Sequence, residues 1–168
     1  MDELARYSLL AGYVRYIGER PDILDIGCGE GLLRRHLDGV PIGHYTGIDL
    51  CSTAIARARG LRDGFTTFLC ADVMSTELAS ADLIVLNEVL YFADDPTAML
   101  ERIAGLLRPD GHLLVSIWRH AGDRHLWSNL RRHFRLEDTV KIQNPSSRLA
   151  RRGWRVACYG PRTPPSSR

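Results

Sequence analysis

The chain has 168 residues, of which 45% are hydrophobic and 25% charged, a balance typical of one globular domain with a sizeable core. No apolar run reaches the roughly 18 residues that a membrane-spanning helix needs, and the N-terminus lacks the residue order of a signal peptide, so we expect a cytoplasmic protein. The cysteines are scattered without a CxxC pair, a spacing that disfavours a zinc site and predicts reduced, mostly buried thiols; we expect no metal.

The net charge of +2 hides an uneven distribution. Residues 1–118 carry 10 arginines against 17 acidic residues, whereas residues 119–168 carry 12 basic residues against 3 acidic ones. A basic final third can mark an anionic partner. The alternative is a solvated arginine-rich face, which we favour because Lys141 is the only lysine beside 21 arginines.

The first half of the chain alternates helices and strands. Residues 2–20 predict one amphipathic helix that ends near Gly18, since the apolar residues recur at helical spacing. Strands are then predicted over 22–27, 44–50 and 64–72, with a helix over 30–37 and another that Ser52 caps and that runs to Gly60.

The second half continues this alternation. Residues 81–90 begin as a fully apolar strand, typical of a parallel strand covered on both faces. A helix starts at Asp95-Pro96 and runs to about residue 107, and a turn over 108–111 leads into a strand over 112–118. A helix over 123–133, strands over 136–143 and 153–160, and a polar tail expected to be disordered complete the chain.

Repeated strand–helix units predict a parallel sheet with right-handed crossovers and helices on both faces. The two final strands have no long helix between them, so they predict an antiparallel hairpin at one edge. The fold class is therefore α/β: a doubly wound, seven-stranded, mostly parallel sheet. We expect one domain over residues 1–160, followed by the tail over 161–168.

The stretch ILDIGCGEG, residues 23–31, is the strongest local signal. Ligands of such sheets bind at the carboxyl ends of the strands, where the first strand opens into these glycines. A dinucleotide fold needs G-x-G-x-x-G, but the spacing is G-x-G-x-G with Leu32 at the last position. Asp25 would repel a pyrophosphate, so it favours a ligand that presents a cation there.

With this stretch the chain resembles the class I (Rossmann-like) S-adenosylmethionine-dependent methyltransferases of the small-molecule type. The other motifs follow in order over residues 20–118: GIDL (47–50), CADVM (70–74), ADLIVLNEVLYF (81–92) and LLRPDGHLLVSIW (106–118). The resemblance implies a Rossmann-like methyltransferase fold that binds S-adenosylmethionine and releases S-adenosylhomocysteine.

The resemblance also implies the cofactor-binding residues. The backbone of Gly27, Cys28 and Gly29 would follow the methionine portion, and Asp25 would orient this loop or the ammonium group. The ribose would be bound at Asp49 and Leu50, the adenine at Asp72 and Val73, the methyl group would lie over Asn87, and Tyr7 would cover the cofactor. Two of these residues have a structural alternative, since Asp72 and Asn87 could each cap a turn or strand end.

The candidate catalytic residues follow the fourth and fifth predicted strands. His120 is the natural general base because its pKa lies near neutrality, although a surface histidine is an equal alternative. Glu88 could pair an amine substrate or accept a proton, or it could cap the next helix. Tyr91 and Trp118 offer flat walls for a substrate, and Trp118 could instead belong to the core.

These features predict methyl transfer to an oxygen or nitrogen atom of a small molecule, anionic or carrier-bound, in a biosynthetic pathway. NEVLYF differs from the Asn-Pro-Pro-aromatic pattern of methyltransferases that act on adenine or glutamine amino groups, which makes a nucleic-acid substrate a weaker hypothesis. Two alternatives stay open: an RNA methyltransferase, suggested by the basic final third, and a cofactor-binding partner subunit, suggested by how little sequence is available for a lid. The sequence fixes neither the substrate nor the oligomeric state.

Overall fold

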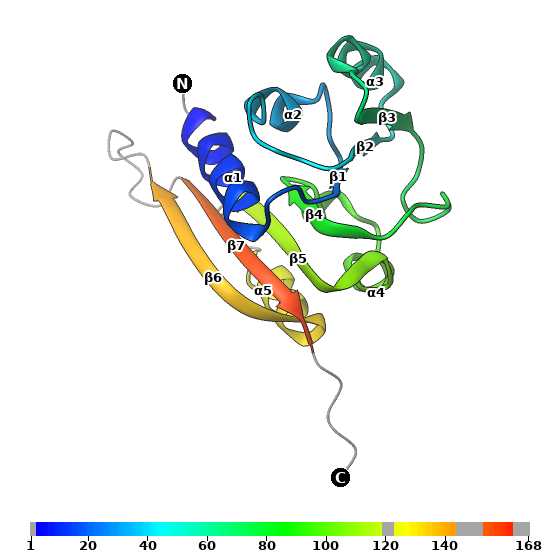
Figure 1. The fold of residues 1–168 in the computed structure, drawn as a ribbon. Coiled ribbons are helices and arrows are strands. Elements are labelled where there is room, and N and C mark those ends of the chain that lie inside the picture. The colour runs from blue at the N-terminus through cyan, green and yellow to red at the C-terminus, as the bar shows by residue number, and fades with distance from the viewer. Residues whose placement is uncertain (1–2, 119–122, 144–152, 163–168) are drawn as a thin grey trace.

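The computed structural model describes residues 3–118, 123–143 and 153–162, and they form a single seven-stranded sheet flanked by helices (Figure 1). The strand order is β3-β2-β1-β4-β5-β7-β6. The first five pair in parallel, and β7 is antiparallel to both β5 and β6. The predicted doubly wound sheet with an antiparallel edge hairpin is confirmed.

The strands lie close to their predicted ranges. They are β1 (Ile23–Ile26), β2 (Tyr45–Asp49), β3 (Thr66–Cys70), β4 (Ala81–Asn87), β5 (Leu107–Trp118), β6 (Phe134–Gln143) and β7 (Gly153–Pro161). The helices are α1 (Leu4–Ile17), α2 (Leu32–His36), α3 (Ser52–Ala58), α4 (Pro96–Leu106) and α5 (Arg124–His133), with short 3-10 turns η1 (Arg59–Leu61) and η2 (Leu90–Phe92). Of the predicted tail, residues 163–168 lie outside the described part of the chain.

Two layers of helices cover the two faces of the sheet. Alternate residues of β4 point to opposite faces: Leu83 and Val85 pack with α1, α2 and α3, whereas Ile84 and Leu86 pack with α4 and α5. All four are fully buried, because a parallel strand covered on both sides has no solvent face. Figure 1 shows α1 and α5 on opposite faces of the β5–β7 end of the sheet.

The start of α4 follows the predicted chemistry. Asp95 accepts the backbone N–H groups of Thr97 and Ala98, and Pro96 occupies the first helical position. The predicted cap of α3 is wrong: Ser52 is already the first helical residue, and Cys51 precedes it without a side-chain cap. The Asp49 carboxylate accepts the N–H of Cys51, the residue that precedes the helix.

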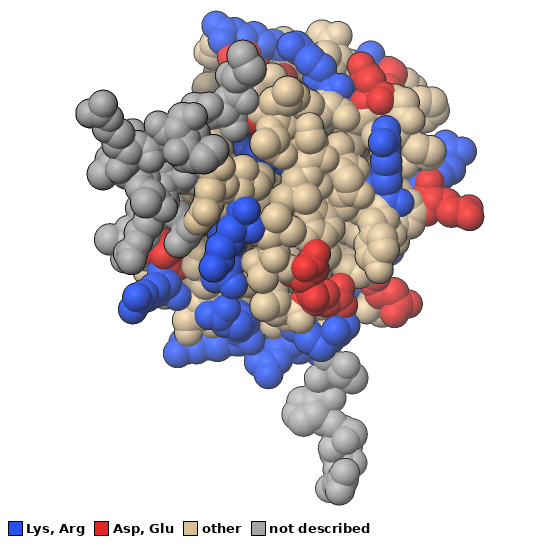
Figure 2. All heavy atoms as spheres, turned by 90° about the vertical axis from the view of Figure 1, so that its left-hand side faces the viewer, with Lys and Arg blue, Asp and Glu red and all other residues tan. Residues whose placement is uncertain are grey.

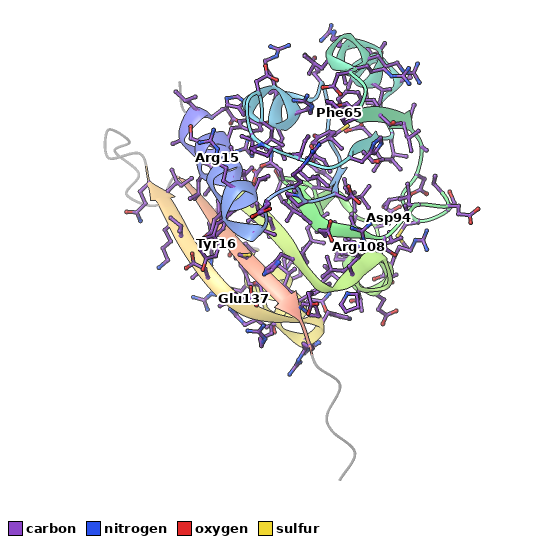
Figure 3. The ribbon with its side chains drawn as sticks, in the orientation of Figure 1. Arg15, Tyr16, Phe65, Asp94, Arg108 and Glu137 are labelled. Atoms are coloured by element: carbon purple, nitrogen blue, oxygen red, sulfur yellow. The ribbon has the colours of Figure 1, made fainter. Side chains whose placement is uncertain are left out.

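The turn predicted over 108–111 is incorporated into β5, which starts at Leu107 and contains a register shift opposite Ala81 and Leu83. The ion pairs of Arg108 hold this segment against the neighbouring strands. Its guanidinium binds Asp82 at 2.7 Å and Asp22 at 2.9 Å, and the Asp22 carboxylate also accepts the N–H of His44. This ion cluster, with Arg108 labelled in Figure 3, ties together the amino-terminal ends of the parallel strands.

Candidate active site

The glycine turn after β1 is held by backbone bonds to the end of β2. The N–H groups of Gly27 and Cys28 both donate to the carbonyl of Ile48, at 2.7 and 3.1 Å. Gly27, Gly29 and Gly31 have φ angles of 70°, 54° and 77°, which side-chain-bearing residues rarely adopt. A Cβ at Gly27 would lie 2.3 Å from a methyl carbon of Val89, so glycine also allows close packing of this turn against β4's loop.

Asp49 joins this turn to the beginning of α3. One carboxylate oxygen accepts the N–H of Gly29 at 2.9 Å and the other accepts the N–H of Cys51 at 2.8 Å. Each oxygen keeps a lone pair for a further donor. The structure therefore places Asp49 and Gly29 together, as expected for two residues of one site.

Asp25 is buried beneath the turn, with 2% of its surface exposed. One of its oxygens accepts the hydroxyl of Tyr45, and the other, Oδ1, has no partner among the described residues. Burial raises the pKa of the Asp25 carboxyl to about 7, partly offset by the hydrogen bond from Tyr45. A buried carboxylate with an unsatisfied oxygen suits a ligand that brings positive charge or N–H donors.

A cavity of ≈ 510 Å³ opens beside the glycine turn and runs along the ends of β1, β2 and β3. It is lined by five of the ten predicted cofactor residues, Gly27, Asp49, Leu50, Asp72 and Val73, and by the candidate catalytic residue Glu88. Asp72 also accepts the N–H of Met74 at 2.9 Å, so its structural alternative as a turn cap is realised at the same time. Cys28 faces the helical layer and is buried, and burial raises its pKa.

Tyr7 and Asn87 meet on the other side of the turn. The ring of Tyr7 on α1 stacks on His36 of α2, with ring centres 4.8 Å apart. Burial raises the pKa of Tyr7, and its hydroxyl lies near enough to the Asn87 side chain for that amide to offset part of this rise. The Asn87 oxygen also accepts the hydroxyl of Ser116 at 2.7 Å. Tyr7 is thus placed near the end of β4 by neighbours on two other elements, α2 and β4.

Glu88 has a φ of 62°, and no other non-glycine residue in the described ranges has a positive φ. Its two oxygens accept the hydroxyls of Tyr91, at 2.9 Å, and Ser116, at 3.2 Å. Burial raises the pKa of Glu88, while these two donors and Arg6 lower it. A strained backbone that aims a satisfied carboxylate into a hollow is the arrangement that functional sites favour.

Arg6 and Trp154 belong to this site and were missed in the sequence. Arg6 is 4% exposed, lies 3.7 Å from Glu88, and has its guanidinium carbon 5.1 Å from the ring centre of Trp154. Trp154 packs edge-on against Trp118 at 4.6 Å. Arg6 could have been found, since it shares the apolar stripe of α1 with Leu10 and Tyr13; Trp154 could not, because only the β5–β7 register brings it there.

The predicted general base His120 lies outside the described residues. The cysteine prediction is half right: all four thiols are free, but Cys51 and Cys70 are exposed. In the described part of the chain, no group of three or more His, Cys, Asp or Glu side chains could hold a metal ion. None of the helices described there is long and apolar enough to cross a membrane.

The residues at the turn fit S-adenosylmethionine on two observations. Asp25 Oδ1 is a buried acceptor without a donor, as a site for an ammonium group would leave it. A Cβ at Gly29 would enter open space, whereas that at Gly27 would be blocked, so the backbone at Gly29 is approachable from outside. Adenosine could then extend along the cavity lined by Asp49 and Val73.

Comparison with known proteins agrees with this geometry. The chain matches the family described as "Methyltransferase domain" over residues 24–115. An uncharacterised methyltransferase of Mycobacterium tuberculosis is 35% identical over 96 residues, which are 55% of this chain and 48% of that protein. A malonyl-[acyl-carrier protein] O-methyltransferase of Hahella chejuensis is 32% identical over 126 residues, which are 67% of this chain and 45% of that protein.

Among solved structures, N-methyltransferase NodS of Bradyrhizobium japonicum in complex with S-adenosyl-L-homocysteine has a TM-score of 0.82. It is 24% identical, and the alignment covers 96% of this chain and 88% of that one, a likeness of fold. The chain spans about half the length of the two curated relatives. Because the family match covers more than half of its residues, the chain belongs to the methyltransferase domain family.

Proposed function

We propose that the protein transfers a methyl group from S-adenosylmethionine to an oxygen or nitrogen atom of a small molecule. The observation that carries this proposal is the hydrogen bond from the Gly29 N–H to Asp49. Asp49 lines a cavity that Asp72 and Val73 also line. Family membership and the names of relatives such as the malonyl-[acyl-carrier protein] O-methyltransferase support it.

The cofactor supplies an activated methyl group on a sulfonium sulfur. The chain's own residues bind and orient it: Asp25 and the glycine turn at the amino acid end, Asp49 at the ribose, and Asp72 with Val73 at the base. Leu50, which is largely exposed, adds an apolar edge to the same cavity. Orientation is the main task of the protein, since holding two reactants in line can contribute about 7–11 kcal/mol.

Glu88 is the residue best placed to receive a proton from the methyl acceptor. It lines the cavity beside Val89, and its carboxylate is held in one position by Tyr91 and Ser116. Its raised pKa makes it a stronger base than an exposed glutamate. Tyr91, whose pKa burial and Glu88 both raise, stays a neutral hydroxyl that orients this carboxylate and offers its ring to the substrate.

Three arginines among the described residues do not favour RNA as the substrate, because they lie away from the glycine turn. Arg131 and Arg132 lie in the last turn of α5, and Arg162 donates to their backbone carbonyls at 3.2 and 2.7 Å. This end of α5 leads into Phe134, which pairs with Pro161 at the end of the sheet opposite the glycine turn. Figure 2 shows blue side chains gathered along the lower edge of one face.

The first test is the melting temperature of the purified chain with S-adenosylhomocysteine, S-adenosylmethionine or NAD. At 100 times its dissociation constant, a ligand adds about 2.7 kcal/mol to the free energy of unfolding. We expect both adenosyl ligands to raise the melting temperature of the wild type and of Asp110→Ala, an exposed control, and to raise that of Asp49→Ala by clearly less. A rise with NAD alone would contradict the proposal.

The second test is transfer itself. Methyl-labelled S-adenosylmethionine is incubated with the chain and with pools of small hydroxy acids, phenols and amines, and the label is followed into product. Label in a small molecule supports the proposal. Cofactor binding without transfer to any pool would favour the partner-subunit alternative.

A further inference from the structure

Arg6 is a buried cation whose hydrogen bonds are incomplete. One terminal nitrogen of its guanidinium binds Glu3, but Nε and Nη1 have no acceptor among the residues that the structure describes. Nη1 lies 3.7 Å from Glu88 Oε1, too far for a hydrogen bond. Buried charged donors without acceptors are costly, so this arrangement calls for an additional oxygen.

The described side chains around Arg6 offer no acceptor within hydrogen-bond distance of Nε and Nη1. Each oxygen of Glu88 already accepts one hydroxyl, from Tyr91 or Ser116, and Oε1 stays 3.7 Å from Arg6 Nη1. On its other sides the guanidinium faces aromatic rings, with its carbon 5.0 Å from the centre of Tyr7 and 5.1 Å from that of Trp154. Rings favour a cation electrostatically but offer no lone pair to its N–H groups.

Arg6 does not itself line the cavity, but its neighbours connect it to the acceptor side of the proposed reaction. Its partner Glu88 lines the cavity, and Tyr7 reaches Asn87 at the end of β4. A planar arginine suits an anionic oxygen pair better than a lysine would, because its donors are fixed in one plane. The aromatic rings of Tyr7 and Trp154 beside it suit a flat, apolar body attached to that anion.

We propose that Arg6 is a substrate-binding residue that receives a carboxylate of the methyl acceptor, so that the enzyme selects planar organic acids over their neutral counterparts. This inference rests on the proposed function, because it places the acid next to Glu88. Arg6 would fix the substrate by its anion, and Glu88 would face the atom that is methylated. No covalent step involves Arg6.

The test uses the full chain saturated with S-adenosylhomocysteine, whose binding is measured first and separately. Benzoate and 3,4-dihydroxybenzoate are then titrated by calorimetry beside the matched amides, benzamide and 3,4-dihydroxybenzamide. We expect each acid to bind the wild type at least tenfold more tightly than its amide. Arg6→Met is expected to abolish this preference, and Arg6→Lys to restore only part of it.

Arg15→Met is the matched control, since Arg15 lies on the same helix, is exposed, and is labelled in Figure 3. It should keep the preference for acids. The affinity for S-adenosylhomocysteine should be the same in all four proteins, which also shows that the variants are folded. If the wild type binds acids and amides equally, or if Arg6→Met keeps the preference, Arg6 is a structural tie between α1 and β4 and the proposal is wrong. Failure to bind S-adenosylhomocysteine would instead overturn the proposed function.

Discussion

Asp49 accepts the backbone N–H of Gly29 at 2.9 Å, and this bond links the loop after β1 to the loop after β2. The second carboxylate oxygen accepts the N–H of Cys51, so one side chain positions two loops of the proposed cofactor site. The acidic residue at the end of β2 therefore has a structural task as well as the ligand-binding task that the sequence suggests.

The first prediction concerns this carboxylate. Asp49→Ala leaves two N–H groups without their acceptor, so we expect a loss of about 1–3 kcal/mol in the free energy of unfolding. The affinity for S-adenosylhomocysteine is expected to fall at least tenfold. Asp49→Asn keeps one acceptor oxygen and is expected to lie between the wild type and Asp49→Ala in both urea denaturation and calorimetry. Equal affinities in all three proteins would exclude Asp49 from the site.

The second prediction separates backbone strain from steric overlap in the glycine turn. Gly29→Ala and Gly27→Ala both place a Cβ at positive φ, which costs about 1–2 kcal/mol. Only Gly27→Ala also drives that Cβ to 2.3 Å from Val89, which is expected to cost a further ~1–3 kcal/mol. In urea denaturation, Val89→Ala should recover part of the loss in Gly27→Ala and none of the loss in Gly29→Ala. Identical behaviour of the two glycine variants would contradict the packing of Val89 on the turn.

Much of this site follows from the sequence, because its residues come from local patterns. The glycine turn, Asp49 and Asp72 each lie at or just after the carboxyl end of a strand, and parallel strands bring these ends to one edge. Glu88 was predicted as a candidate, but its positive φ was not, since nothing in NEVLYF marks a left-handed residue as glycine would.

What the sequence could not predict depends on long-range pairing. Trp154 reaches Arg6 because β7 pairs with β5 in one register, with Trp118 opposite Trp154. In the sequence, Ser116 is a single polar residue in an apolar strand. Its hydrogen-bond partners become clear only from the β4–β5 register, which sets Ser116 opposite Asn87. The predicted cap of α3 was wrong by one residue, since the helix already includes Ser52.

The third prediction concerns the pH dependence contributed by Asp25. Its pKa is about 7 in the folded chain against 3.8 as a free side chain, so the folded state holds a proton that the unfolded state releases. This contribution to stability is fully present below about pH 4 and is lost as the pH rises to about 7, a change of up to about 4 kcal/mol.

Asp25→Asn should therefore show a smaller decrease in stability than the wild type between pH 4 and 7, measured by urea denaturation at each pH. Asp22→Asn is the matched contrast, because hydrogen bonds from His44 and Arg108 lower the pKa of Asp22. Its contribution has the opposite sign: it is present above the unfolded pKa and is lost as the pH falls. Parallel stability curves for the wild type and Asp25→Asn would show that Asp25 is ionised throughout.

The fourth prediction uses the positive φ of Glu88. Glu88→Gly and Glu88→Ala both remove the carboxylate and its bonds to Tyr91 and Ser116, so their difference isolates the backbone. We expect Glu88→Gly to be more stable than Glu88→Ala by about 1 kcal/mol in thermal and urea unfolding, because glycine adopts a φ of 62° without a steric penalty. A more stable alanine variant would mean that Glu88 does not hold this backbone conformation in solution.

The last prediction tests how the Glu88 carboxyl is tuned. Ser116 is fully buried and donates to Glu88, and this hydrogen bond lowers the pKa of Glu88. Ser116→Ala is therefore expected to raise that pKa, followed directly by ¹³C NMR of the Glu88 carboxyl during a pH titration. Tyr91→Phe should act in the same direction, because the Tyr91 hydroxyl also lowers it. If Glu88 is the base, the acidic limb of kcat/KM should move to higher pH in both variants.

Thr66→Val is the control, since it removes a buried hydroxyl from β3, three strands away from β4, and should leave the titration of Glu88 unchanged. A Ser116→Ala variant with the wild-type titration would mean that this hydrogen bond does not tune the carboxyl and that Tyr91, Arg6 and the backbone of Trp118 suffice.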